Sequence, residues 1–131
     1  MPSEGHNRQA LGAELPVFDE DSFVKRVLGD VDIARQVAAR AIDDITQHRI
    51  GLSEALDSVD SEKLHFHAHS LKGVSKLMEC HQLARCAEVI ERQSTNQIIA
   101  AARKETESII PLINAAIDAL GDFCSKKNGS Q

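Results

Sequence analysis

The stretch His65-Phe66-His67-Ala68-His69-Ser70-Leu71-Lys72-Gly73 decides how the whole chain is interpreted. It holds three of the six histidines at alternate positions, and a lysine and a glycine follow the last of them. Residues three and four apart share a face only in a helix. His69 therefore lies beside Lys72 and Gly73 only if this part of the chain is helical.

The segment does follow a helical period, because its apolar positions recur at steps of three and four residues. These predicted core positions are Leu64, Ala68, Leu71, Ser75 and Met78. A neighbouring stripe consists of His65, His69, Lys72 and Lys76. His67 points toward the far edge of the core stripe, so helical phase separates it from the other two histidines.

A long helix is predicted before this segment. Asp30 is a suitable N-cap, and apolar residues then recur with a helical period for about 28 residues. Gly51 lies inside this run and costs it about 1 kcal/mol relative to alanine. His48 lies on the apolar seam, where a half-buried histidine with a hydrogen-bond partner is expected.

A shorter helix over Phe18–Leu28 is predicted to come first. Asp19 is a good N-cap, and Phe18 and Phe23 have the spacing of a hydrophobic staple. Gly29 is the expected stop.

Two more helices are predicted after the histidine segment. A short connection around 79–81 leads into a helix over 83–91. The histidine helix before this connection is expected to begin at a cap formed by Ser58 or Asp60. A turn at 94–96 precedes a last helix over 99–120, in which Pro111 should cause a kink and Gly121 a stop.

These segments predict an all-α protein, an antiparallel four-helix bundle with a short additional N-terminal helix. The bundle is expected over residues 17–124, with flexible tails at 1–16 and 125–131.

Composition narrows the function classes. The chain has 131 residues, 42% of them hydrophobic, and a formal net charge of −5, so it lacks the basic footprint of a nucleic-acid binder. No apolar run approaches the roughly 20 residues of a membrane span, and no signal peptide is evident. The three cysteines lack C-x-x-C spacing, which is typical of reduced thiols in a cytoplasmic protein.

The helical face around His69 has the chemistry of a phosphoryl acceptor. An imidazole is a nucleophile at neutral pH, Lys72 supplies a cation one turn away, and Gly73 clears the flank for a partner. A mid-helix glycine costs stability, and close approach by another protein explains it. The chain has no phosphate-cradling glycine-rich loop and no kinase signature, so another protein must supply the phosphoryl group.

Ala68-His69-Ser70-Leu71-Lys72-Gly73 resembles the A-H-x-L-K-G motif of histidine-containing phosphotransfer (HPt) domains, and the helical layout resembles that family over residues 17–122. The resemblance implies a phosphorelay intermediate without ATP-dependent kinase activity of its own. His69 would accept a phosphoryl group from the aspartyl phosphate of one receiver domain and donate it to another. Lys72 would neutralise the phosphoryl oxygens, and Gly73 would give the partner access.

The implied partners are response-regulator receiver domains, including those of hybrid histidine kinases. The protein would act as a monomer with no cofactor of its own, and the Mg²⁺ would belong to the receiver. Two positions depart from the family. Glu79 replaces a glycine, which predicts a different end to the histidine helix, and Val74 is bulkier than usual, which predicts an altered surface nearby.

Two alternatives remain. A docking module that has lost phosphotransfer would bind receivers without accepting label. A metal site of His65, His67 and His69 is disfavoured, because His67 lies on another face and lysines at 72 and 76 would repel a cation, so no metal is predicted. His65 and Lys76 are either solvated surface residues or auxiliary residues that shape the site around His69.

Overall fold

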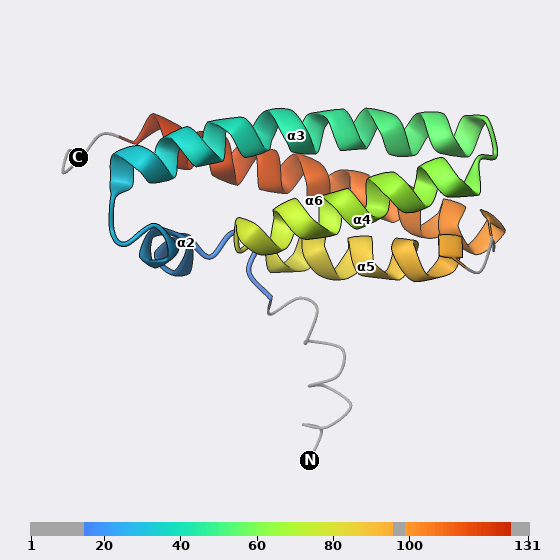
Figure 1. Ribbon diagram of the computed structural model, residues 1–131, viewed down its shortest axis with the longest axis horizontal. Helices are drawn as coiled ribbons and strands as arrows, with labels where there is room; N and C mark the ends of the chain where they lie inside the picture. The colour runs from blue at the N-terminus through green and yellow to red at the C-terminus, as the bar shows by residue number, and fades with distance from the viewer. Residues whose placement is uncertain (1–14, 96–98, 127–131) are drawn as a thin grey trace, which may run out of the picture.

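The computed structural model describes residues 15–95 and 99–126, and within these ranges every element is helical (Figure 1). The helices are α2 (Glu20–Arg26), α3 (Val31–Asp57), α4 (Ser61–Leu77), α5 (His81–Thr95) and α6 (Ile99–Ser125). The all-α prediction is thus confirmed for the described part of the chain. The tails predicted at 1–16 and 125–131 fall mostly outside it.

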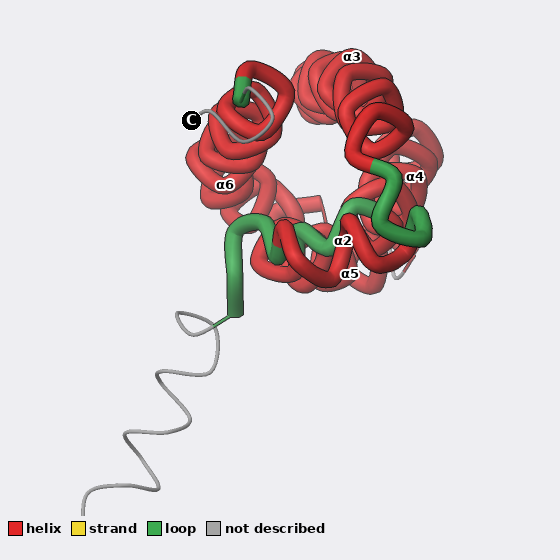
Figure 2. The backbone as a smooth tube through the Cα atoms, turned by 90° about the vertical axis from the view of Figure 1, so that its left-hand side faces the viewer, coloured by secondary structure: helices red, strands yellow, loops and turns green. Residues whose placement is uncertain are grey.

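The four long helices are arranged in a ring (Figure 2), and their buried apolar side chains form one common core. Helix α4 packs against α3 and α5, and α6 closes the ring by packing against the same two helices. The short α2 lies at the end of the molecule where α3 begins (Figure 1). This arrangement buries one face of α4 and leaves the opposite face to solvent.

Small and branched apolar residues fill the core, as expected for a chain without Trp or Tyr. Every predicted core position of α4, from Leu64 to Met78, is buried. The rings of Phe18 and Phe23 lie 5.8 Å apart, and both also contact Phe123 near the end of α6. The predicted staple is therefore present and is part of a three-ring cluster at one end of the core.

Three aspartates cap the helices, because each carboxylate accepts a backbone N–H that the first turn leaves unpaired. Asp19 caps α2 and Asp30 caps α3, as predicted. Asp60 accepts the N–H of Lys63 at 3.0 Å and caps α4. The choice between Ser58 and Asp60 is thereby settled, since Ser58 is the C-cap of α3.

The prediction of a different end to the histidine helix was wrong. Glu79 adopts φ = 62°, the left-handed conformation that a glycine would take. The N–H of Cys80 reaches back to the carbonyl of Ser75 at 2.9 Å, so the last turn of α4 closes in the usual way. The carboxylate of Glu79 accepts hydrogen bonds from Arg26 and His81, which offset the backbone cost.

Other helix ends differ from the prediction. Helix α2 is capped by Val27, and Leu28 is the first left-handed residue, one position before Gly29. Helix α5 still includes Ser94, which was predicted to lie in a turn, while Asn96 is outside the described residues.

The last helix is longer than predicted. Helix α6 continues through Pro111 and past the predicted stop at Gly121, to Ser125. By length and composition α6 could also cross a membrane, although charged residues interrupt its apolar sequence. A core helix of a bundle meets the same criteria, and the stripe of α6 from Ala102 to Phe123 is buried against the other helices.

Candidate functional site

His69 lies in the middle of α4, on the face turned away from the core. Its side chain is 62% exposed, whereas Ala68 and Leu71 on either side are fully buried. The same helical period that anchors α4 in the core therefore presents the imidazole to solvent. Because α4 is packed against the core, the backbone that carries the imidazole is held in place.

Glu91 of α5 joins His69 to Lys72. One carboxylate oxygen, Oε2, lies 2.7 Å from Nδ1 of His69, and the other, Oε1, lies 2.6 Å from Nζ of Lys72. The Glu91 side chain is only 16% exposed, and that of Lys72 22%. The structure thus brings the predicted histidine and lysine together through an acid that the sequence did not single out.

The charge state of Glu91 fixes the hydrogen-bond direction. Burial alone would raise the pKa of this carboxyl, but hydrogen bonds and positive charge from Lys72 and His69 outweigh burial and lower it. An ionised carboxylate only accepts hydrogen bonds. Nδ1 of His69 must therefore carry the proton in this contact, and in the neutral ring the lone pair is then on Nε2.

Gly73 leaves open space beside His69. An added Cβ at this position would meet no other atom within 4 Å, and φ is not in the left-handed region. Neither packing nor backbone conformation therefore requires a glycine here. The missing side chain at Gly73 therefore affects only how closely another molecule can approach this face of α4.

His65 and Lys76 lie in different surroundings. The His65 ring stacks on that of His69, with centroids 6.2 Å apart and planes 12° apart, and its Nδ1 lies 3.4 Å from the backbone carbonyl of Glu91. His65 is thus in contact with the site. Lys76 is exposed on the same side of α4 and lines a groove toward α5.

His67 is separated from the other two histidines, as helical phase predicted. Its Nδ1 lies 3.1 Å from Nδ1 of His48 on α3, which gives His48 the hydrogen-bond partner expected for it. The His67 ring also covers Gly51, where an added Cβ would lie 2.3 Å from it. Gly51 therefore makes room for this pair.

A metal site of His65, His67 and His69 finds no support in the described residues. The only group there with three converging potential ligands consists of Asp19, Glu79 and His81. In that group Glu79 already forms an ion pair with Arg26, whose positive charge opposes a metal ion.

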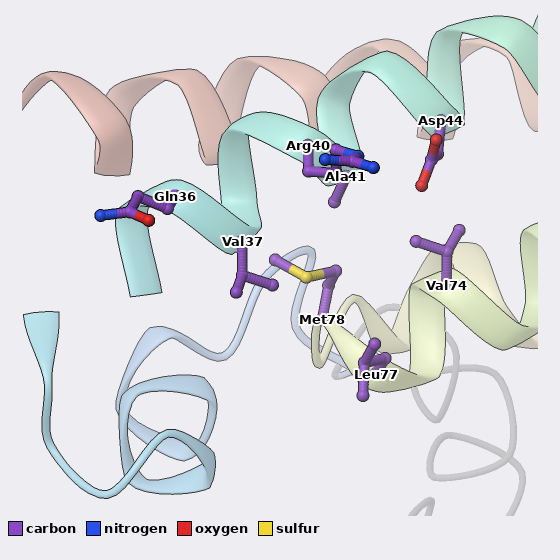
Figure 3. A pocket seen from close by; sticks show the side chains of 8 residues that line it. All are labelled: Gln36, Val37, Arg40, Ala41, Asp44, Val74, Leu77 and Met78. Carbon is purple, nitrogen blue, oxygen red and sulfur yellow. The ribbon is translucent and has the colours of Figure 1, made fainter. Parts of the chain in front are cut away.

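An apolar groove lies between α3 and α4. Its volume is about 320 Å³, and the side chains of Val37, Val74, Leu77 and Met78 line it (Figure 3). Val74 is partly buried here and packs against the core. The bulk of this residue therefore shapes the groove on the α3 side of the helix, while His69 and Glu91 lie on the α5 side.

Comparison with known proteins agrees with this site. The sequence model of the Hpt domain family matches residues 36–123, and the chain therefore belongs to the Hpt domain family. This family takes part in phosphotransfer in two-component signalling, where its members interact with receiver domains. No curated protein and no solved structure shows significant similarity to the chain.

Proposed function

We propose that the protein is a phosphorelay intermediate. Nε2 of His69 accepts a phosphoryl group from the aspartyl phosphate of one receiver domain and donates it to the aspartate of another. The observation that carries this proposal is the carboxylate of Glu91, which holds Nδ1 of His69 on one oxygen and Nζ of Lys72 on the other. We also infer an antiparallel four-helix bundle that acts as a monomer.

The chemistry follows from this contact. The lone pair on Nε2 attacks phosphorus, the N–P bond forms, and the acyl P–O bond breaks with its electron pair leaving on the aspartate carboxylate. The ring then carries both the phosphoryl group and the Nδ1 proton, and thus a positive charge. Glu91 stabilises that charge through its hydrogen bond, and the reverse sequence of steps delivers the group to the second receiver.

Lys72 and Gly73 support the transfer in different ways. The ammonium of Lys72 lies one turn from His69 and adds positive charge beside the phosphoryl oxygens, which carry the developing charge in such reactions. Gly73 lets the surface around the receiver's aspartate come close. The chain needs no cofactor of its own in this scheme, and the Mg²⁺ that assists transfer is contributed by the receiver.

Exposed apolar residues suggest where a receiver docks. Phe66 is 59% exposed and Leu77 51%, and with Gly73 between them they form a line on α4 beside His69. Leu77 also lines the apolar groove toward α3. A partner that covers this line would bury apolar surface and place its active site over the imidazole.

The direct experiment mixes the protein with receiver domains carrying labelled phosphate. Wild type is expected to take up acid-labile, base-stable label, and His69→Gln is expected to take up none. His6→Gln serves as the control for loss of a histidine elsewhere in the chain. If wild type binds receivers but accepts no label from any of them, the protein is a docking module and the relay proposal fails.

A further inference from the structure

A second groove lies between α4 and α5, on the side of His69 away from α3. Its volume is about 430 Å³, and Leu15, Ala84 and Val89 provide apolar parts of its lining. The charged or titratable side chains that line it are Lys76, His81, Arg85, Glu88 and Arg92. Cations therefore predominate in this groove, although the whole chain has a formal net charge of −5.

The cations of this groove are available to a partner. Lys76, Arg85 and Arg92 are exposed, and within residues 15–95 and 99–126 none of the three forms an ion pair or a hydrogen bond through its side chain. His81 is bound to Glu79. Three unpaired basic side chains thus face one carboxylate, that of Glu88.

The groove lies near the site, on the two helices that carry His69 and Glu91. Lys76 follows His69 by seven residues, which places it two turns along the same face, about 10 Å away along the helix axis. Arg92 directly follows Glu91, the residue that holds His69. A partner that covers His69 and extends two turns along α4 would therefore reach Lys76 at the edge of this groove.

We propose that this groove, with Lys76, Arg85 and Arg92, is the electrostatic docking surface for the carboxylate-rich surface around the phosphorylated aspartate of a receiver domain. The inference rests on the proposed function, because it assigns the partner of the same site. A receiver must bring its aspartyl phosphate and the acidic groups that hold its metal ion, and this surface is anionic. The cations attract it and orient it, whereas the groove toward α3 has one cation and one anion, Arg40 and Asp44, beside its apolar side chains and so no excess of positive charge.

The test compares two double charge reversals in the full chain. Arg85→Glu/Arg92→Glu changes the groove, and Lys25→Glu/Lys104→Glu makes the same change in net charge at exposed positions outside it. Transfer of label from a phosphorylated receiver is followed at low and high ionic strength. Circular dichroism and thermal unfolding establish that both variants are folded.

The groove variant is expected to slow transfer on the order of 10-fold at low salt, because steering by complementary charge changes association rates by this amount or more. The difference should shrink as salt screens the charges. The control variant should slow transfer much less. If both variants slow transfer equally, or neither does, the groove is not the docking surface.

A small phosphodonor separates this result from the proposed function. Phosphoramidate phosphorylates an exposed imidazole without a receiver, so wild type and both variants should accept label from it at the same rate. If wild type exchanges label with receivers and the groove variant equals it, the groove proposal fails while the relay stands. If wild type takes no label from any receiver, both fail. Arg85→Gln/Arg92→Gln, which removes charge without reversing it, replaces the groove variant if that one does not fold.

Discussion

Nδ1 of His69 and Oε2 of Glu91 lie 2.7 Å apart, on two different helices. This contact assigns the ring nitrogens different roles, because the nitrogen that donates to a carboxylate cannot also be the nucleophile. It also places a negative charge next to the ring before a phosphoryl group arrives.

Glu91→Ala should slow phosphotransfer by about 10- to 100-fold, since hydrogen bonds to charged groups contribute about 1.5–3 kcal/mol. Glu91→Gln should have a smaller effect, because the amide oxygen can still accept from Nδ1 but carries no charge. Rapid-quench measurement of label transfer checks this order. Glu107→Ala, at an exposed position on α6, is the control. A Glu91→Ala variant as fast as wild type would remove Glu91 from the mechanism.

Gly73→Ala should separate stability from function. Its Cβ would enter open space, so the variant should be more stable by about 1 kcal/mol, the helix-propensity difference between the two residues. Transfer from a receiver should nevertheless slow on the order of 10-fold, because small displacements of reacting groups are costly. The Cβ of Gly121→Ala on α6 would also enter open space, so this variant should gain the same stability without slower phosphotransfer. Equal transfer rates for the two variants would show that Gly73 has no role in access.

The sequence predicted the parts of the site that lie on one helix. The 3.6-residue period places His69, Lys72 and Gly73 on one face and sends His67 to another, and both features are present in the structure. Glu91 could not be found in this way. Its position beside His69 depends on how α5 is set against α4, and the connection between them passes through a left-handed residue, Glu79, whose conformation its amino-acid type disfavours.

The same limit applies to Gly51. From the sequence alone this glycine only weakens a long helix. Its use becomes visible when α4 is packed on α3, because the ring of His67 then occupies the space where a Cβ would be. Helical period predicts which residues share a face, but contacts between helices also require their relative register and rotation.

Glu79 provides a prediction about the end of α4. Glu79→Gly removes the left-handed backbone cost of about 1–2 kcal/mol but also the contacts with Arg26 and His81. Because Arg26 is 47% exposed, its ion pair contributes at most about 1 kcal/mol. Glu79→Gly should therefore be as stable as wild type or slightly more stable. Glu79→Ala, which keeps the cost and loses the contacts, should be the least stable of the three in denaturant unfolding. If Glu79→Gly is as unstable as Glu79→Ala, the side-chain contacts dominate.

Gly51→Ala should destabilise the protein even though alanine is the better helix former. The new Cβ would lie 2.3 Å from the His67 ring and force it away from His48, and such overpacking costs about 1–3 kcal/mol against a propensity gain of about 1 kcal/mol. In a His67→Ala background the same substitution should become stabilising. A double-mutant cycle by denaturant unfolding measures this change of sign. Additive effects would mean that the ring moves aside at no cost.

The His48–His67 pair also makes stability depend on pH. Burial lowers the pKa of both rings below the ordinary value of 6.5. The positive charge of His67 lowers the pKa of His48 further, and the positive charge of Lys63 lowers that of His67 further. Asp44 opposes the shift at His48, and Glu54 opposes it at His67. A hydrogen bond between two Nδ1 atoms requires one of them to be unprotonated, so full protonation of both rings breaks this hydrogen bond between α3 and α4.

The sign of the effect follows from proton uptake. Below pH 6.5 the unfolded chain binds more protons at these two positions than the folded chain, because their pKa is lower in the folded state. The contribution of the pair to the free energy of unfolding is therefore complete above pH 6.5 and is lost as pH falls from there through the lowered pKa values. Denaturant unfolding between roughly pH 5 and 8 measures this slope. His48→Gln and His67→Gln should each flatten it, since one titrating partner is gone and the Nδ1–Nδ1 contact with it. An unchanged slope in both variants would assign the pH dependence to other groups and leave the pair as a packing contact only.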